Sequence, residues 1–374
     1  MNALEKLTEQ APGLTFELPD GTPVIKLGLI ATLYFKEGYT PQSKQAVTQC
    51  FERFKEEFGQ HLKGQYDGRY KKLTDVNFNK KILSILETVP NEQYEWHISS
   101  AGSANEASEY SLSALNSFEV HGDQRRSFIK MTLPWTILNE PDGAARYQDW
   151  IIYLADKVKA DHGYGGLSSI LPFDFDSYMP MEFQLAQQYR GLEVDSLVTN
   201  FKRELLDHIK GINWYTIVSN RFTEKLGGID AISHSFSGRG DVEVFEYQYG
   251  LIVRAGNLPD LGSINEALPA AYISVNQVFK SLRIPTPDQL HTYSPYGNCF
   301  EEDSSARWYS RFDQEENRSK SPARLEAGQP CSVAGYWFTP AQKESRRYFD
   351  QGEILPSFSG SNWGDTLWYW SGED

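Results

Sequence analysis

Hydrophobic positions near the start of the chain follow two different periods. Residues 22–36 form a nearly continuous run of aliphatic, β-branched and aromatic side chains between Asp-Gly and Glu-Gly pairs, which predicts a buried strand. From there to Phe58 the apolar side chains recur at helical spacing, with Thr40 placed to cap the first turn and Pro41 at the first helical position. The chain is therefore expected to begin with a buried strand followed by an amphipathic helix.

The rest of the chain mixes grouped strands with helices rather than alternating them strictly. This order is typical of an α+β fold with mainly antiparallel sheets flanked by helices. The expected helices are 78–89, 147–162, 181–190, a short one ending at 226, and 264–282; the expected strands begin at 94, 107 and 126 and cover 168–175, 212–220, 231–236 and 242–256.

Changes in this rhythm predict three segments. Residues 1–178 and 179–284 repeat a similar rhythm and are expected to form two α+β sub-domains. Residues 285–374 are polar, aromatic and turn-rich without clear periodicity, which predicts an irregular segment packed on both sub-domains. Tyr293, Tyr296, Trp308 and Phe312 are expected to dock it.

Composition and charge exclude several classes of protein. Hydrophobic residues make up 40% of the chain, which is ample for a core, and no signal peptide or membrane-spanning run is present, so a cytoplasmic location is expected. A net charge of −14 disfavours binding to nucleic acid and favours a basic partner. Neither the scattered histidines nor Cys50, Cys299 and Cys331 show metal-ligand spacing, so no metal or cofactor is expected.

A glycine-rich stretch, "KADHGYGGLSS", follows the expected helix at 147–162. Gly163 is expected to end this helix in a left-handed conformation, and Gly165 with Gly166 to allow a tight turn or a close backbone approach. A phosphate-binding loop would need a strand before the glycines and a helix after them, and a nucleophile elbow would need a second glycine after the serine. The stretch therefore predicts structure rather than catalysis.

Carboxylates cluster at three places in the sequence. Asp174 and Asp176 are either solvated acids at a strand end, a divalent-cation site, or the acid and base of a hydrolase. The other two clusters are Glu243 with Glu246, and residues 301–303, which are either solvated faces or a mimic of nucleic-acid charge.

Four stretches together resemble the type VI secretion immunity family, the TsiV-like proteins that accompany VRR-nuclease and related nuclease toxins. They are "LGLIATLYF", "GYGGLSS", "GLIVRAGNLPDLGSINEALPAAYISVNQVFKSLR" and "ARWYSRFD", which lie in this order between Thr22 and Phe312. The tail from Pro322 to Asp374 does not match the family pattern, so its role stays open.

The resemblance implies a cytosolic, non-enzymatic antidote that binds a toxin's nuclease domain and occludes its basic groove. A carboxylate-dependent hydrolase using Asp174 and Asp176 is the alternative. Contacts with the toxin are expected in exposed loops, at Asp174, Asp176, Tyr178, Glu243, Glu246, Glu301, Glu302, Asp303 and Trp308. Residues expected to shape the fold are Gly163, Gly165, Gly166, Arg254, Gly256, Pro259 and Gly262.

Overall fold

The computed structural model describes residues 3–123, 125–199, 203–313, 324–331, 334–358 and 366–372. It divides the chain into two compact units, Met1–Asp313 (unit 1) and Gln314–Asp374 (unit 2). None of the helices in these described ranges combines the length and the apolar character needed to span a bilayer.

Unit 1 is built on one large sheet whose paired strands are antiparallel. The strands are β1 (Phe16–Glu17), β2 (Pro23–Phe35), β3 (Gly64–Tyr66), β4 (Tyr70–Lys72), β5 (Glu95–Ser99), β6 (Ser111–Leu115), β7 (Ser127–Pro134), β8 (His162–Ile170), β9 (Tyr215–Ser219), β10 (Val242–Tyr247) and β11 (Gly250–Ala255). Their order is β10-β11-β9-β8-β2-β7-β6-β5-β3-β4, and β1 pairs with β2. The α+β class expected from the sequence is confirmed.

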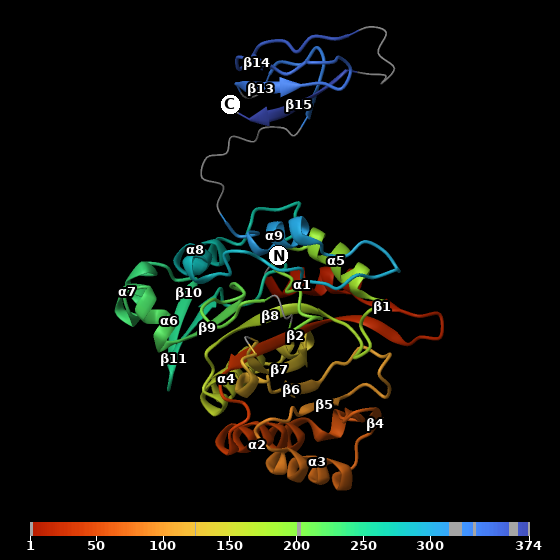
Figure 1. The fold of residues 1–374 in the computed structure, drawn as a ribbon, viewed down its shortest axis with the longest axis vertical. Coiled ribbons are helices and arrows are strands. Elements are labelled where there is room, and N and C mark those ends of the chain that lie inside the picture. Colours follow the sequence, from red (N-terminus) through yellow and green to blue (C-terminus); the bar gives the residue numbers. More distant parts are fainter. Residues whose placement is uncertain are drawn as a thin grey trace. The chain divides into compact units, whose positions relative to one another are not determined.

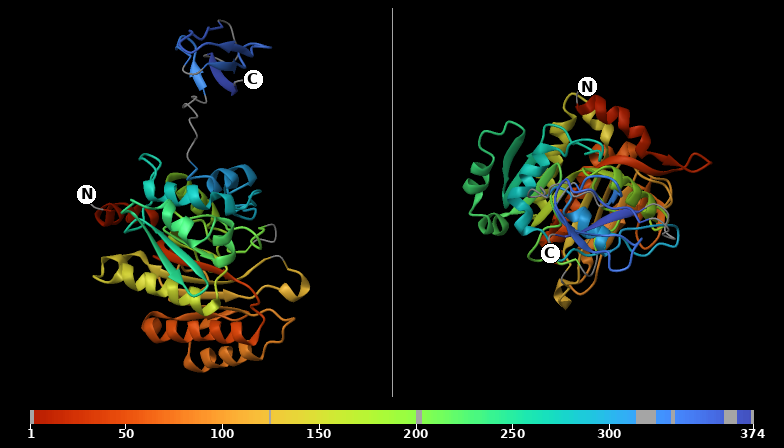
Figure 2. Two further views of the ribbon diagram at one scale, coloured as in Figure 1. Left: turned by 90° about the vertical axis from the view of Figure 1, so that its left-hand side faces the viewer. Right: turned by 90° about the horizontal axis from the view of Figure 1, so that it is seen from above.

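Helices cover both faces of this sheet (Figure 1, Figure 2). One layer holds α2 (Pro41–Phe58), α3 (Asp75–Glu87) and α4 (Gly143–Val158). On the opposite side lie α5 (Met179–Gln188), α8 (Ala270–Phe279) and α9 (Glu302–Tyr309), and three further helices are α1 (Ala3–Gln10), α6 (Asn220–Lys225) and α7 (Ile229–Ser235).

The first strand and helix form as their sequence pattern predicts. Thr40 accepts a hydrogen bond from the backbone N–H of Ser43, which satisfies one of the free donors at the start of α2, and Pro41 occupies the first turn. The apolar stripe of α2 then packs on the sheet, where the ring of Phe51 stacks on Trp96 with 4.0 Å between centroids. The cap and the buried apolar face therefore both stabilise α2 as the sequence pattern predicts.

The glycine-rich stretch is a strand, not the end of a helix. Helix α4 ends at Val158, and the next residue, Lys159, has a φ of 52° and provides the left-handed turn that Gly163 was expected to supply. Gly163, Gly165 and Gly166 lie inside the fully buried strand β8. A Cβ on Gly163 would lie 2.6 Å from the carbonyl oxygen of Thr32, and neighbouring groups leave equally little room at the other two. The backbone of β2 at Gly163, and the side chains of Tyr147 and Asn213 at the other two positions, approach too closely for a residue larger than glycine.

Two predicted strands also differ from the structure. Residues 231–236 lie mostly in helix α7. The alternating apolar and polar residues that suggested a strand also fit a short helix, in which Ile232 is buried. The run 242–256 is a hairpin of β10 and β11, in which Tyr247 pairs with Gly250 around a two-residue turn. Short apolar runs do not distinguish these alternatives by periodicity alone.

The domain boundaries differ from the predicted ones. Strand β9 pairs with β8, so the strands that follow residue 178 extend the same sheet instead of forming a second sub-domain. Residues 285–313 belong to unit 1, where Phe312 packs in the main core. Segments that repeat a similar rhythm therefore share one core here.

Unit 2 has a sheet and a core of its own. Its strands β12 (Arg324–Glu326), β13 (Gly335–Phe338), β14 (Arg347–Phe349) and β15 (Leu367–Gly372) form an antiparallel sheet in the order β12-β15-β13-β14. The buried side chains that hold it together are Cys331, Trp337, Phe349, Leu355 and Trp368. The prediction of an irregular C-terminal segment is therefore wrong for these residues.

Candidate functional site

A row of polar and aromatic side chains crosses the sheet on the face opposite α2, α3 and α4. Strand register makes each member of the row a direct neighbour of the next, in the order Tyr66, His97, Ser113, Lys130, Thr32 and Tyr164. At the β2–β8 end the row enters a buried charge cluster. At the β3–β5 end it forms the floor of an open hollow.

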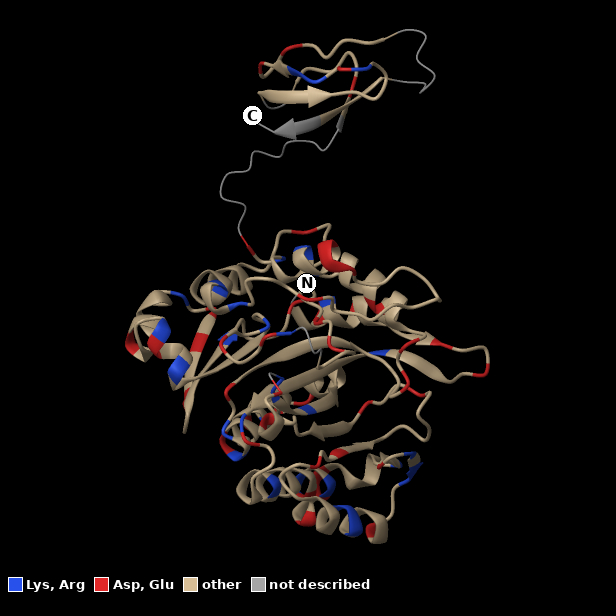
Figure 3. Ribbon diagram, viewed as in Figure 1, with Lys and Arg blue, Asp and Glu red and all other residues tan. Residues whose placement is uncertain are grey.

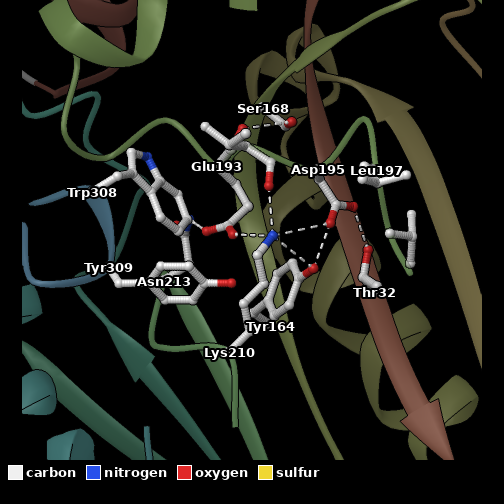
Figure 4. Close-up of polar contacts among 12 residues, drawn as sticks. Thr32, Tyr164, Ser168, Glu193, Asp195, Leu197, Lys210, Asn213, Trp308 and Tyr309 are labelled. Atoms are coloured by element: carbon white, nitrogen blue, oxygen red, sulfur yellow. Dashed lines mark hydrogen bonds and ion pairs between the residues drawn. The ribbon is translucent and has the colours of Figure 1, made fainter. Parts of the chain in front are cut away.

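The buried cluster is centred on Lys210, which is 1% exposed (Figure 4). Its ammonium group donates to the carbonyl oxygen of Val194 at 2.5 Å and to the hydroxyl of Tyr164 at 3.2 Å. The same nitrogen lies 3.0 Å from Glu193 Oε1 and 3.4 Å from Asp195 Oδ1. We call these residues and their direct partners the Lys210 network. The network links residues of the connection between α5 and β9 to side chains of the sheet.

Asp195 is the second centre of the Lys210 network. Its carboxylate accepts hydrogen bonds from Tyr164 and, at 2.7 Å, from the hydroxyl of Thr32, and it lies 3.0 Å from the ammonium group of Lys130. Burial by itself would raise the pKa of this carboxyl, but the charges of Lys130 and Lys210 and the two hydrogen bonds outweigh it and hold the pKa below its usual range. Asp195 is therefore ionised and fully paired.

Glu193 joins this network to α9 and the residues after it. Its carboxylate accepts from the Asn213 amide at 2.7 Å and from the Arg311 guanidinium at 3.1 Å. The guanidinium of Arg311 lies 3.5 Å from the centre of the Trp308 ring, so Trp308 is only 4% exposed. This corrects the sequence prediction, because a ring enclosed between Arg311 and the core cannot anchor a partner.

Two more buried pairs extend the cluster toward α5 and residue 291. The guanidinium of Arg203 lies 3.1 Å from Asp288, and His291 is hydrogen-bonded to Glu182 at 2.8 Å. All these side chains are almost completely shielded from solvent. The arrangement therefore positions the chain, and its groups do not reach a substrate.

The open hollow lies over β3, β5, β6 and β7 and has a volume of about 390 Å³. We call it the aromatic hollow; the lining side chains that matter here are Tyr66, Tyr70, Glu95, His97, Glu106, Ser113, Lys130, Phe173 and Phe175. Phe173 is its central ring, with ring centroids 4.4 Å from Tyr66 and 5.2 Å from His97. Its half-buried rings form an accessible apolar surface between charged residues.

The charge in the aromatic hollow is negative. Desolvation lowers the pKa of His97 to about 3, so this ring is neutral near pH 7, and it is hydrogen-bonded to Ser113 at 2.6 Å. The positive charge of Lys130 is already paired with Asp195. The exposed Glu95 and the half-buried Glu106 remain as carboxylates of the lining, and burial raises the pKa of Glu95 against the opposing effect of Lys81.

Asp174 and Asp176 border this hollow. Both acidic side chains are exposed. Phe173 precedes Asp174 and Phe175 lies between the two acids, and both phenylalanines line the hollow. The segment is fixed by a hydrogen bond from the Asp174 amide to Ala104 O at 2.9 Å. Tyr178, which precedes α5, is half-buried. The sequence pattern led to the prediction of the two acids but not of the two phenylalanines. Their alternation with the acids is the sequence signal that could have indicated them.

A second group of acids lies on residues 289–303, which we call the acidic loop. Glu301, Glu302 and Asp303 are exposed and line a shallow hollow of about 670 Å³. Tyr293 and Tyr296 on the same loop are 88% and 67% exposed. The sequence analysis expected both tyrosines to pack against the fold, so they are corrected to exposed aromatic residues.

The aromatic hollow and the acidic loop are neighbours. The hydroxyl of Ser294 donates to the carbonyl oxygen of Asp176 at 3.4 Å, and Thr292 contacts Met179. The segment that carries Asp174 and Asp176 therefore lies between the two features. Two of the three predicted carboxylate clusters, Asp174 with Asp176 and residues 301–303, therefore lie in one surface region.

The remaining predicted acids lie elsewhere. Glu243 and Glu246 belong to β10, the edge strand at the end of the sheet opposite β3 and β4 (Figure 3). Glu243 is ion-paired with Arg254 of the neighbouring strand. The fold therefore does not bring this pair together with the acidic loop.

The end of β11 and the turns that follow it contain the other residues expected to shape the fold. Arg254 bridges Glu243 and, at 3.1 Å, the side chain of Gln148. Gly256 and Gly262 have φ values of 92° and 60°, a region that favours glycine, and Pro259 between them is buried. This turn-rich stretch therefore holds a fixed path beside the core.

The His, Cys, Asp and Glu side chains were also compared with the groupings that bind metal ions. Within the described ranges, no three His, Cys, Asp or Glu side chains are grouped so that they could hold a metal ion. No disulfide joins Cys50, Cys299 and Cys331, and burial raises the pKa of Cys50 to about 12.

Comparison with known proteins shows similarity to a family model and to solved structures. Residues 46–312 match the model of the TsiV family, described as type VI immunity for VRR-NUC. The fold is similar to that of the Pseudomonas aeruginosa T6SS protein PA0821, with a TM-score of 0.72, 21% sequence identity, and coverage of 84% of this chain and 91% of that chain. A search of curated proteins finds no match. The family match ends just before the end of unit 1, so unit 2 lies outside it.

Proposed function

Because this chain belongs to the TsiV family of type VI immunity proteins for VRR-NUC, we propose that it binds the nuclease domain of such an effector and covers its basic groove. Inhibition of this kind needs a complementary surface and no catalysis. The effector's substrate is nucleic acid, so we place this action in the cytoplasm. The family assignment agrees with the resemblance found in the sequence.

The observation that carries the proposal is the composition of the acidic loop. A nuclease presents positive charge to phosphates, so exposed carboxylates at 301–303 are steered toward its groove and can pair there with lysine and arginine. Tyr293 and Tyr296 supply large exposed rings on the same loop, and tyrosine is enriched among the residues that dominate binding energy. These two replace Trp308 as the proposed anchors.

The hydrolase alternative gains nothing from the geometry. Asp174 and Asp176 are exposed on a segment of bends and turns, whereas a catalytic pair needs an environment that separates the two pKa values. Their place between the aromatic hollow and the acidic loop fits contact with a partner.

The proposal is tested by reversing charge on the acidic loop. In Glu302→Lys/Asp303→Lys the effector's basic groove would face two cations, and we expect an affinity loss of at least about 3 kcal/mol, roughly 100-fold in Kd. Binding is measured by calorimetry with the nuclease domain, and protection by co-expression in cells. The matched control is Glu52→Lys/Glu56→Lys, which makes the same charge change on exposed residues of α2 across the sheet.

Thermal melting of each variant separates a binding defect from misfolding, because lysines in the first turn of α9 oppose the helix dipole. Unchanged binding and protection by Glu302→Lys/Asp303→Lys would remove the acidic loop from the interface. A wild-type chain that neither binds nor protects against VRR-NUC effectors would overturn the proposed function itself.

A further inference from the structure

We infer that the aromatic hollow is the seat of a lysine or arginine side chain that the effector presents beside its groove. This inference rests on the proposed function and names the chemistry of one contact within it. The argument depends on the size of the hollow, its rings, its charge and its neighbours.

The hollow is large enough to admit a long side chain. About 390 Å³ lies at the lower end of the range for small-ligand pockets. The sheet forms a rigid floor, since His97 and Ser113 are fixed to each other across β5 and β6. A partner loop can therefore insert a side chain without displacing the strands.

The rings of the hollow suit a cation with an apolar stem. The rings of Phe173 and Tyr66 are stacked. The centroid of the Tyr70 ring lies 6.3 Å from that of Phe173. The faces of such rings attract ammonium and guanidinium groups, while the methylene stem of lysine or arginine packs on apolar surface.

The charges of the hollow select the same occupant. Glu95 and Glu106 are carboxylates of the lining, and Lys130 is neutralised by Asp195. The nearby cations Lys71 and Lys81 are both tied to the carboxylate of Asp67, at 2.8 and 2.7 Å. An acidic side chain or a phosphate would meet the carboxylates of Glu95 and Glu106 here, whereas a basic side chain is attracted to them.

The position of the hollow allows one partner to use both features. The segment with Asp174 and Asp176 borders the hollow and is hydrogen-bonded to the acidic loop through Ser294. A nuclease domain seated on the acidic loop therefore lies beside the hollow. Basic side chains that flank its phosphate-binding groove are then the nearest groups able to enter.

The first test measures whether the hollow is filled in the complex. Ser113→Cys places a thiol on the floor of the hollow, in a Cys299→Ser background because Cys50 and Cys331 are buried. We expect the purified nuclease domain of a VRR-NUC effector that the chain binds to slow maleimide labelling of this thiol at least tenfold. The control is Glu56→Cys on α2, whose labelling rate should not change.

The second test removes the negative charge without changing shape. Glu95→Gln/Glu106→Gln keeps an oxygen that can accept the hydrogen bond from the Gly102 amide, which is 2.7 Å long at Glu106. We expect the Kd for the nuclease domain to rise at least tenfold and to depend less on salt than in the wild type. Glu52→Gln/Glu56→Gln is the matched control and should bind like the wild type.

The outcomes separate the inference from the proposed function. Tight binding of the nuclease domain with no change in labelling would overturn the inference and leave the proposed function standing. Labelling that slows with protein concentration alone would assign the hollow to a second copy of this chain and overturn it too. Absence of binding by the wild-type chain would overturn both.

Discussion

Replacing Lys210 by methionine tests whether the buried charges hold unit 1 together. Methionine keeps an unbranched apolar stem but removes the ammonium group that lies between Glu193 and Asp195. Both carboxylates stay buried, and the carbonyl oxygen of Val194 and the hydroxyl of Tyr164 each lose a hydrogen-bond partner. The substitution therefore leaves buried negative charge with less compensation.

The magnitude follows from the partners that remain. Removing one partner of a buried ion pair typically costs about 3–5 kcal/mol. Here Asp195 keeps Lys130 and Glu193 keeps Arg311, so we expect the lower end, about 3 kcal/mol. With an unfolding entropy of roughly 2.1 cal/mol/K per residue over unit 1, that loss lowers Tm by about 5 °C.

Calorimetry and far-UV circular dichroism measure this transition. The control is Lys63→Met, which removes an exposed ammonium group near β3 and should change Tm by about 1 °C or less. The double variant Lys210→Met/Asp195→Asn should recover part of the loss, because it removes one of the uncompensated charges. A Lys210→Met protein that melts within 1 °C of the wild type would refute the reasoning.

Three further predictions concern single positions in unit 1. Gly163→Ala should lower stability by roughly 1–3 kcal/mol in denaturant unfolding, because its Cβ would meet the carbonyl oxygen of Thr32 at 2.6 Å; a neutral result would contradict the close approach of β8 to β2. Thr40→Ala should cost about 1 kcal/mol by the same assay, through loss of the cap on α2. Burial lowers the pKa of His162 to about 4, below its value of about 6.5 in the unfolded chain. Its contribution to stability is therefore complete above pH 6.5 and is lost as the pH falls toward 4, with a slope approaching 1.4 kcal/mol per pH unit. His162→Gln should flatten the unfolding free energy over that range, and an unchanged profile would contradict this origin.

Local elements followed from the sequence where short-range signals agreed. At α2 the cap, the proline and the apolar stripe all indicate the same helix, and β2 is an apolar run bounded by turns. The family assignment also followed from ordered stretches between Thr22 and Phe312, and the family match confirms it. These features depend on residues that are close in sequence.

Predictions failed where long-range packing decided the outcome. Gly163 looks like a helix stop until β2 is known to lie against it. Trp308 and Tyr293 are both aromatic residues in polar surroundings, yet one is covered by Arg311 and the other is exposed. Exposure depends on which distant segment covers a residue, and the local pattern does not contain that information.

The sequence by itself determined the α+β class, the family and the acidic character of this protein, because periodicity, motif order and charge are properties of the chain. Only the tertiary structure decided that Tyr66, His97, Ser113, Lys130, Thr32 and Tyr164 form one row, because six separate strands contribute them. It also placed the aromatic hollow beside the acidic loop. The physical reason is that strand pairing fixes neighbours across the sheet, and pairing between distant strands depends on how the whole core is buried.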